Sequence, residues 1–339
     1  MINRPLGPFS VSAIGLGCMN LSHAYAVPPA PAAAAELLLR ALDLGITHFD
    51  TATLYGFGAN EELVGRVLSP HRSKFTLASK CGIHGVAANG QIKRVIDGRP
   101  ETLKSSCEES LKRLRTDVID LYYLHRWDKK VPIEESVGAL AALVDAGKIR
   151  TIGLCEVSAG TLRRAAAVHR IAAVQSEYSL CTRNPEIAVL DACRGIGASF
   201  VAFCPLGRGF LAGALRDVSG LAAKDIRRAM PRFEPANHAL NLRVQREYED
   251  IAREAGCRPS QLALAWVLAR GPHVLAIPGT TSIAHLQENA CAPAAAPPET
   301  LMQRLDDLFG PAALAGDRYN TATQAEIDTE CFEPASPAP

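Results

Sequence analysis

The chain has 339 residues and is 48% hydrophobic, enough to bury the core of one large α/β domain or two medium ones, which argues against global disorder. Its 36 Lys and Arg nearly balance its 35 Asp and Glu, which argues against nucleic acid or an anionic membrane as the main partner. No apolar run reaches the length of a membrane span, the start shows no signal pattern, and the ten cysteines form no C-x-x-C pair or zinc-type cluster. We therefore expect a cytoplasmic enzyme with reduced thiols and no metal.

Eight short β-prone segments alternate with helical patterns along the chain. We expect strands at 11–18, 46–50, 75–80, 118–125, 149–155, 172–178, 198–204 and 273–279. Eight β-then-α units predict an α/β fold of the (β/α)8 TIM-barrel type, with an N-terminal β-hairpin and long loops at the C-terminal face. An open parallel sheet of similar content remains the alternative by pattern alone, but no G-x-G-x-x-G follows an early strand, so its usual dinucleotide fingerprint is missing.

The helical patterns carry their own start and stop signals. Pro100 is expected in the first turn of a helix whose apolar residues recur at helical spacing. Gly45 and Gly147 are expected to end helices, as C-terminal glycines do. Asn60 stands where an N-cap would, just before an acidic first turn.

Three segments interrupt the alternation. A Pro/Ala-rich stretch at 24–35 is expected to be a linker or loop, and 81–100 to be a long loop after the third strand. A large insertion runs from 212 to about 256. Long loops at the carboxyl ends of barrel strands usually cover a site. We expect one barrel domain over residues 1–325 and a disordered tail over 326–339.

Ionisable residues end three of the expected strands. Asp50, Lys80 and His125 are each the last residue of a strand, and Tyr55 follows Asp50 by five positions. Taken singly, each has an ordinary explanation: a turn carboxylate, a surface ammonium, a core histidine or a half-buried aromatic. Parallel strands of a barrel end at the same rim, so the four side chains together predict one site.

The chemistry of these four residues suits proton donation to a carbonyl oxygen. A free tyrosine titrates near pH ~10, and a nearby ammonium lowers that pKa. A carboxylate paired with Lys80 would hold the ammonium in place, and His125 would donate a hydrogen bond to a substrate oxygen or share the proton with the phenol. No side chain of this set supplies a hydride, so a redox cofactor is required.

The segments that carry these residues, DTATLYG, ASK and LYYLHR, resemble the tetrad motifs of the aldo-keto reductase superfamily. The resemblance runs from IGLGCMN to LQENA and includes SLKRLRTDVIDLYYLH, GKIRTIGL, VQSEYSL, CPLGRGFLAG, PRF, QLALAWVLA and IPGT in the same order. The chain most resembles the bacterial and plant branch that includes potassium-channel β-subunit-like reductases.

The resemblance implies a role for each residue of the tetrad and an extended NADPH across the barrel mouth, with NADH as a possible substitute. Tyr55 would be the general acid, Lys80 and Asp50 the pair that lowers its pKa, and His125 the partner that orients the carbonyl. The residues implied for cofactor binding are Gly17, Met19, Asp50, Cys155, Gln175, Phe203, Cys204, Leu206, Gly207, Arg208, Gly279, Thr280, His285, Glu288 and Asn289. Among them, Gln175 and Cys155 would bind the carboxamide, Phe203 would stack on the nicotinamide, 204–208 would hold the pyrophosphate, and 279–289 the adenosine end.

The sequence departs from the family pattern at several cofactor positions. Cys155 stands where serine is usual, and a thiol is a poorer hydrogen-bond partner. Phe203 replaces a common tyrosine and can still stack. His285 and Ser282 stand where cations often bind the 2′-phosphate, which should weaken discrimination for NADPH over NADH.

The resemblance leaves the substrate open. Met19, Tyr25, His84 and Trp127 are candidate walls of a substrate pocket, with loop packing as the alternative for each. A mostly apolar rim would suit an aldehyde, ketone or quinone-like carbonyl. Arginines of the insertion would fold over the cofactor as a clamp or form a solvated face: Arg227, Arg228 and Arg232.

Three functions fit this sequence. The first is an NADPH-dependent reductase (EC 1.1.1.-) acting on small-molecule carbonyls. The second is a cofactor-sensing regulatory module with slow turnover, which the short stretch before the first strand disfavours because it is too short for a blocking peptide. The third is an NAD-dependent alcohol or sugar dehydrogenase, which His285 favours. The oligomeric state is left open.

Overall fold

The computed structural model describes residues 1–25, 27–88, 90–213, 215–292 and 297–332. Its centre is an eight-stranded parallel sheet with the order β12-β11-β10-β9-β8-β5-β4-β3. The strands are β3 (Leu16–Gly17), β4 (His48–Asp50), β5 (Thr76–Cys81), β8 (Ile119–Leu124), β9 (Ile149–Cys155), β10 (Ile171–Glu177), β11 (Ser199–Phe203) and β12 (Val274–Ile277). A parallel bridge between Ile14 and Ala276 joins the two ends of the sheet. The predicted (β/α)8 barrel is therefore confirmed.

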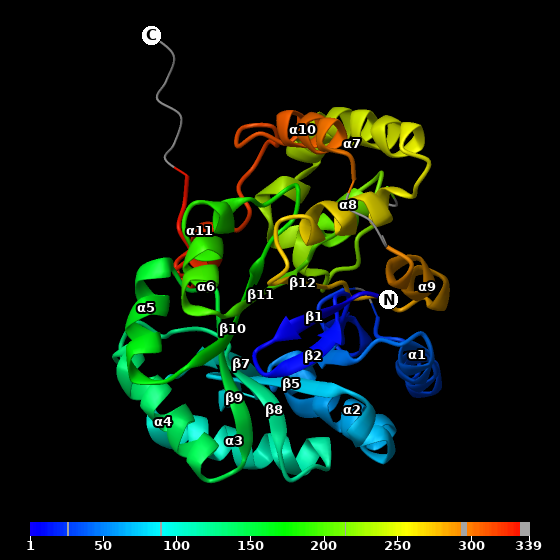
Figure 1. The fold of residues 1–339 in the computed structure, drawn as a ribbon. Coiled ribbons are helices and arrows are strands. Elements are labelled where there is room, and N and C mark those ends of the chain that lie inside the picture. Colours follow the sequence, from blue (N-terminus) through cyan, green and yellow to red (C-terminus); the bar gives the residue numbers. More distant parts are fainter. Residues whose placement is uncertain (26, 89, 214, 293–296, 333–339) are drawn as a thin grey trace.

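Helices surround the barrel and alternate with its strands (Figure 1). They are α1 (Pro31–Asp43), α2 (Ala59–Leu68), α3 (Pro100–Leu114), α4 (Ile133–Asp145), α5 (Ala159–Val168), α6 (Val189–Ile196), α8 (Pro259–Leu268) and α9 (Ile283–Ala290). Outside this alternation lie α7 (Pro235–Glu254), α10 (Glu299–Leu308) and α11 (Thr321–Gln324). Short 3₁₀ helices are Met19–Leu21, Tyr55–Gly58, Ser69–Lys74, Asn184–Glu186, Gly207–Ala212, Ile226–Ala229 and Pro231–Phe233. None of the helices in the described ranges is long and apolar enough to cross a membrane.

The core has two layers because the strands are buried on both faces. One cluster of apolar side chains fills the space between strands and helices. A second cluster lies inside the barrel, where Leu121, Tyr123 and Val201 contact residues of the N-terminal hairpin. That hairpin, β1 (Asn3–Leu6) with β2 (Phe9–Ser12), is antiparallel, and its buried side chains close the end of the barrel opposite the mouth. The mouth at the carboxyl ends is thus the open end.

Several local predictions are confirmed at the helix ends. Pro100 is the first residue of α3. Gly45 and Gly147 lie just beyond α1 and α4, and both take the left-handed conformation that suits a glycine at a helix C-terminus.

Other local predictions are wrong. The single strand expected at 11–18 is divided: Val11 and Ser12 belong to the hairpin, whereas Leu16–Gly17 pairs with β4 and Ile14 forms a single bridge to Ala276 of β12. The long loop expected at 81–100 holds a second antiparallel hairpin, β6 (Ile83–Ala88) with β7 (Gln91–Ile96). Both errors have the same cause, because periodicity shows extended backbone but does not identify its pairing partner.

Asn60 is not a helix cap. Gly58 occupies the N-cap position of α2, and Asn60 lies inside the helix, fully buried. Its side chain accepts a hydrogen bond from Thr51 Oγ1 at 2.6 Å and donates to the carbonyl of Cys18 at 2.9 Å and to Ser22 Oγ at 2.9 Å. Asn60 therefore joins α2 to the loops that follow β3 and β4, close to Tyr55.

Residues 318–332 lie against the barrel mouth. Within the stretch expected to be a disordered tail, Asp328 accepts hydrogen bonds from the Ser158 backbone and hydroxyl at 3.0 and 2.8 Å, and Glu330 accepts one from the Ala159 backbone at 2.7 Å. These contacts place residues 326–332 beside the start of α5. Residues 333–339 lie outside the described part of the chain.

Candidate active site

Four side chains of the predicted tetrad converge at the barrel mouth. Asp50 ends β4, Lys80 is the penultimate residue of β5, His125 directly follows β8, and Tyr55 opens the turn after β4. The Lys80 ammonium donates hydrogen bonds to Asp50 Oδ1, to the carbonyl of Thr51 at 2.9 Å and to Tyr55 Oη at 3.2 Å. The rings of Tyr55 and His125 meet edge to face with centroids 5.9 Å apart. The structure therefore joins Asp50, Lys80 and Tyr55 by hydrogen bonds and places His125 against the ring of Tyr55.

The ion pair at the base of this group is fully buried. Burial opposes the charge on Lys80, but Asp50 and Tyr55 outweigh it and raise the pKa of the ammonium above its usual value. Asp50 also accepts a hydrogen bond from Gln175 Nε2 at 2.7 Å. Because its pKa is raised and Asp50 is held in place by Gln175, Lys80 stays charged beside the phenol at all physiological pH values.

The pKa of Tyr55 moves in the direction opposite to our expectation. Burial raises it, and although Lys80 lowers it, the result is a pKa of about 12 against an ordinary value of 10. Only 8% of Tyr55 is exposed, so the loss of water around the phenolate outweighs the attraction of the ammonium. Tyr55 is consequently a fully protonated donor at neutral pH.

His125 is a neutral imidazole. Burial lowers its pKa well below 6.5, and the charges of Lys80 and Arg126 lower it further. Its Nδ1 is buried and has no hydrogen-bond partner in the described part of the chain. A neutral histidine beside a protonated phenol presents hydrogen-bonding groups without introducing a second cation next to Lys80.

The residues predicted for the nicotinamide end lie next to the tetrad. Gln175 and Cys155 are opposite each other in the pairing of β10 with β9, and both are buried. Phe203 is the last residue of β11 and is half-buried. Burial raises the pKa of Cys155 to about 12, so its side chain is a neutral thiol.

The predicted pyrophosphate loop follows β11, where Cys204 and Leu206 lead into the turn. Gly207, Arg208 and Gly209 all take left-handed backbone conformations there. The buried Arg208 side chain donates to Glu177 Oε2 at 2.5 Å and to the hydroxyl of Tyr25 at 3.3 Å. The loop thus holds a buried guanidinium, and Tyr25 lies with it.

The three arginines of the insertion make different contacts and do not act as one group. Arg227 Nη1 donates to the carbonyl oxygen of Arg208 at 3.1 Å and so touches the loop. Arg228 binds a backbone carbonyl within the insertion itself. Arg232 donates to Thr182 Oγ1 at 2.8 Å and lines a pocket together with Arg208.

The residues predicted for the adenosine end lie at α9. Gly279 packs against Gly17, because a Cβ at either glycine would meet backbone atoms around the other. The hydroxyl of Ser282 accepts from the backbone of His285 and caps α9. The imidazole of His285 is exposed. The other predicted residues of this end are the buried Thr280 and Asn289 and the half-buried Glu288, whose carboxylate accepts from Ser260.

The candidate substrate walls are not all directed to one place. Met19 lies in the turn after β3, and His84 lies in β6 with its Nδ1 buried and without a partner among the described residues. Trp127 donates from its indole nitrogen to the carbonyl of Val131 at 2.7 Å, and its ring lies under Arg164 of α5. Trp127 is therefore engaged in loop packing.

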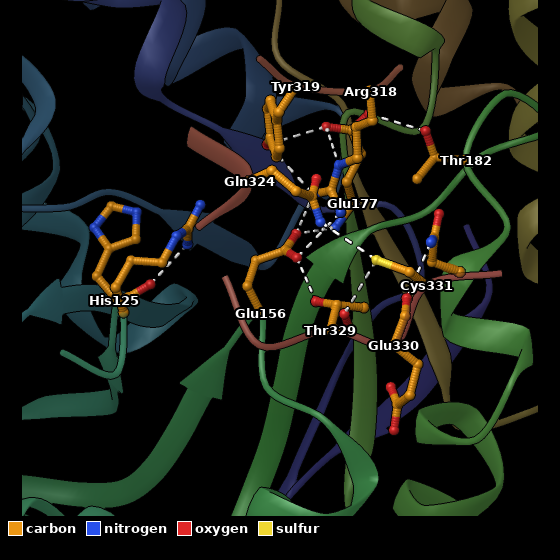
Figure 2. Close-up of polar contacts among 12 residues, drawn as sticks. His125, Glu156, Glu177, Thr182, Arg318, Tyr319, Gln324, Thr329, Glu330 and Cys331 are labelled. Atoms are coloured by element: carbon orange, nitrogen blue, oxygen red, sulfur yellow. Dashed lines mark hydrogen bonds and ion pairs between the residues drawn. The ribbon is translucent and has the colours of Figure 1, made fainter. Parts of the chain in front are cut away.

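A second charged group at the mouth was not predicted from the sequence. Arg318, which is 8% exposed, forms ion pairs with Glu156 and with Glu177, the residues at the ends of β9 and β10 (Figure 2). Thr329 donates to Glu156 at 2.5 Å, and Tyr319 donates to Glu177 at 3.3 Å. Because parallel strands of a barrel end at one rim, the reasoning that located Asp50 could also have located the two glutamates. Nothing in the sequence around Arg318 indicates its contact with them.

Among the described residues, no group of three or more His, Cys, Asp or Glu side chains is arranged to hold a metal ion. The ionisable groups that the structure brings together at the mouth are those of the tetrad and of the cluster around Arg318. The fold and this site define an α/β-barrel enzyme.

Comparison with known proteins identifies the family. The model of the Aldo/keto reductase family matches residues 13–308. The chain is 41% identical over 329 residues to "Aldo-keto reductase yakc [NADP(+)]" of Schizosaccharomyces pombe, covering 96% of each protein. It is 43% identical over 312 residues to "Probable aldo-keto reductase 1" of Glycine max, covering 92% of this chain and 89% of that protein. The chain belongs to the aldo/keto reductase family and is an oxidoreductase.

Solved structures agree with this assignment. The glycerol dehydrogenase AKR11B4 from Gluconobacter oxydans matches with a TM-score of 0.84 at 30% identity, over 93% of this chain and 97% of that one. An aldo/keto reductase from Klebsiella pneumoniae, solved in complex with NADP and acetate, matches with a TM-score of 0.67 at 29% identity, over 95% and 96% of the two chains.

Proposed function

We propose that the protein reduces aldehydes or ketones to alcohols with NADPH, and that Tyr55 donates the proton to the carbonyl oxygen. The observation that carries this proposal is the Lys80 ammonium, which is hydrogen-bonded to both Asp50 and the Tyr55 hydroxyl. NADP-linked relatives, one named for NADP(+) and one solved with NADP, support the cofactor.

The residues at the mouth fit a nicotinamide dinucleotide. Gln175 and Cys155 present an amide and a thiol beside the tetrad, suited to a carboxamide, and Phe203 offers an aromatic face. The guanidinium of Arg208 and the left-handed turn around it suit a diphosphate. The bound cofactor supplies the hydride.

The tetrad residues then act in defined roles. The hydroxyl of Tyr55 donates a hydrogen bond to the carbonyl oxygen and transfers its proton as negative charge develops there. Lys80 stabilises the resulting phenolate, and Asp50 holds the ammonium in position beside the phenol. His125, neutral and next to the Tyr55 ring, orients the carbonyl oxygen by a second hydrogen bond.

The test is cofactor consumption with a panel of aldehydes, α-diketones and quinones, using NADPH and NADH separately. We expect NADPH oxidation by the wild type and a loss of roughly 10²–10⁴-fold in Tyr55→Phe, because the ring remains and only the proton donor is removed. Cofactor affinity, followed by quenching of protein fluorescence, should be unchanged. Equal turnover of the two proteins would overturn the role of Tyr55.

The same panel separates the alternatives. Tight NADPH binding without turnover of any carbonyl by the wild type would favour a cofactor-sensing module. NAD-dependent oxidation of alcohols that exceeds carbonyl reduction would favour a dehydrogenase. The dehydrogenase function is supported by the exposed His285 and by Ser282, which stand at positions where cations would bind a 2′-phosphate. The similarity to a glycerol dehydrogenase also supports it.

The pH dependence of the reaction follows from the two shifted groups. His125 has a pKa well below 6.5 and Tyr55 a pKa of about 12, so neither changes protonation between pH 6.5 and 10. We expect the single-turnover rate of NADPH oxidation at saturating carbonyl to be flat across this range. A loss of rate with a midpoint near pH 8 or 9 would contradict the high pKa of Tyr55.

A further inference from the structure

A guanidinium lies beside His125 with an incomplete set of partners. Arg126 Nη1 donates to the backbone carbonyl of His125 at 2.7 Å, which turns the side chain back over the end of β8. Its Nε is buried and donates to no acceptor in the described ranges. A guanidinium has five N–H donors, so Arg126 retains donors for a further acceptor.

No carboxylate of the described chain neutralises Arg126. The charge of Arg126 lowers the pKa of Glu156, but the Glu156 carboxylate is bound by Arg318 and Thr329, and Figure 2 shows it directed toward these two residues and away from His125. Across the 21 ion pairs found among the described residues, Arg126 takes part in none. Its positive charge is therefore available at the mouth.

The other cations around His125 are already paired. Lys80 is bound to Asp50, and Arg94 of β7 forms an ion pair with Glu326 at 2.6 Å. Arg126 lies at the end of β8, where it donates to the carbonyl of His125, and β9 is the neighbouring strand. Its charge also lowers the pKa values of Cys155 and Glu156, which lie at the end of β9. That position adjoins both the carbonyl-orienting imidazole and the expected nicotinamide end.

We propose that Arg126 is a specificity-determining residue that binds a carboxylate on the substrate, so that the preferred substrates are aldehydes or ketones bearing a carboxylate group. This inference rests on the proposed carbonyl reduction and gives its substrate class. The substrate carbonyl oxygen would face Tyr55 and His125, and the carboxylate would receive charge-assisted hydrogen bonds from the guanidinium. It replaces our expectation of a neutral carbonyl at an apolar rim.

Neither Arg126 nor the substrate carboxylate takes part in the bond changes of the reaction. With the hydride supplied by a reduced nicotinamide, the new C–H bond would form as the carbonyl π pair moves to oxygen, and the proton of Tyr55 would complete the alcohol. The carboxylate and Arg126 keep their charges throughout. Arg126 therefore acts on binding of the substrate and not on its chemistry.

The test compares 2-, 3- and 4-carboxybenzaldehyde with their neutral methyl esters, in the wild type, Arg126→Gln and Arg126→Lys, with Arg253→Gln as the control. Arg253 is an exposed residue of α7, so its change alters net charge without touching the mouth. The three ring positions vary the distance between the carbonyl and the carboxylate. Affinity for NADPH is measured for every variant by fluorescence quenching.

We expect the wild type to favour at least one acid over its ester in kcat/KM, mainly through KM. Arg126→Gln should lose roughly 10- to 100-fold on that acid and little on the ester, since a hydrogen bond to a charged group is lost. Arg126→Lys should retain part of the preference, and NADPH affinity should stay within twofold. Equal use of acids and esters by the wild type would overturn the proposal.

A preference for the acid that survives in Arg126→Gln would also overturn the proposal. So would a loss of NADPH affinity that lowers kcat/KM on acids and esters equally.

A binding measurement separates this inference from the proposed function. Calorimetry of benzoate against benzamide, with protein in excess NADP⁺, should show benzoate binding that Arg126→Gln abolishes. If benzoate binds but no aldehyde is turned over, only the proposed carbonyl reduction is contradicted. If aldehydes are turned over but benzoate binds no better than benzamide, only the proposed role of Arg126 is contradicted.

Discussion

Replacing Lys80 with methionine is expected to lower the free energy of unfolding by about 3–5 kcal/mol and to abolish carbonyl reduction. Lys80 and Asp50 are both buried, and removal of the ammonium leaves the carboxylate with the Gln175 amide as its remaining side-chain donor. The phenol of Tyr55 loses its only cationic hydrogen-bond donor in the described structure at the same time. Urea unfolding and NADPH oxidation measure the two effects.

The double variant Lys80→Met/Asp50→Asn distinguishes stability from catalysis. It removes the unpaired charge as well as its partner, so much of the lost stability should return while activity stays absent. If the double variant is no more stable than Lys80→Met, the loss arises from packing and not from a buried uncompensated charge. If either variant keeps near wild-type activity, Lys80 does not assist Tyr55.

Replacing Arg318 with methionine is expected to cost about 3–5 kcal/mol at pH 7, because two buried carboxylates then share one fewer cation. Arg318 forms the ion pairs of the C-terminal segment with Glu156 and Glu177, alongside the hydrogen bonds from Thr329 and Tyr319. We also expect faster proteolysis between residues 310 and 332, since loss of these ion pairs weakens the attachment of the segment to the mouth. Arg304→Met is the control: its ion pair with Glu254 is 52% and 58% exposed, and we expect at most about 1 kcal/mol.

The effect of Arg318 should depend on pH with a definite sign. Burial would raise the pKa of Glu177, but Arg208 and Arg318 outweigh it and lower the pKa to about 2 from 4.5. The folded pKa is depressed, so this stabilisation is present above pH 4.5 and is lost as the pH falls toward 2. The difference between wild type and Arg318→Met should therefore be largest at pH 7 and shrink by pH 3. A difference that is constant with pH would show that the guanidinium acts through packing.

These predictions concern two different kinds of contact. The Lys80 pair joins neighbouring strands and was expected from the ends of those strands. The Arg318 contact joins β9 and β10 to a segment more than 140 residues later, and no local pattern indicates it. Sequence reasoning located the first because regular secondary structure fixes which residues share a rim.

The same distinction explains the local errors. Gly45 and Gly147 were placed correctly because a helix C-terminus depends on a few adjacent residues. Asn60 was misplaced because its side chain bonds to residues of two other loops, which only the folded chain brings near it. The direction of the Tyr55 pKa was wrong for a similar reason: the neighbouring ammonium was foreseen, but the extent of burial was not.

The sequence by itself determined the alternation of strands and helices, the (β/α)8 barrel and the convergence of Asp50, Tyr55, Lys80 and His125, because these follow from periodicity and from parallel strands ending at one rim. It also indicated the family, through the resemblance of its motifs and their order. Only the tertiary structure decided the second hairpin, the contacts of residues 318–332 at the mouth, the protonation state of Tyr55 and the lack of an ion-pair partner for Arg126 among the described residues. Each of these depends on which distant groups exclude water from a side chain or pair with its charge, and a linear pattern does not contain that information.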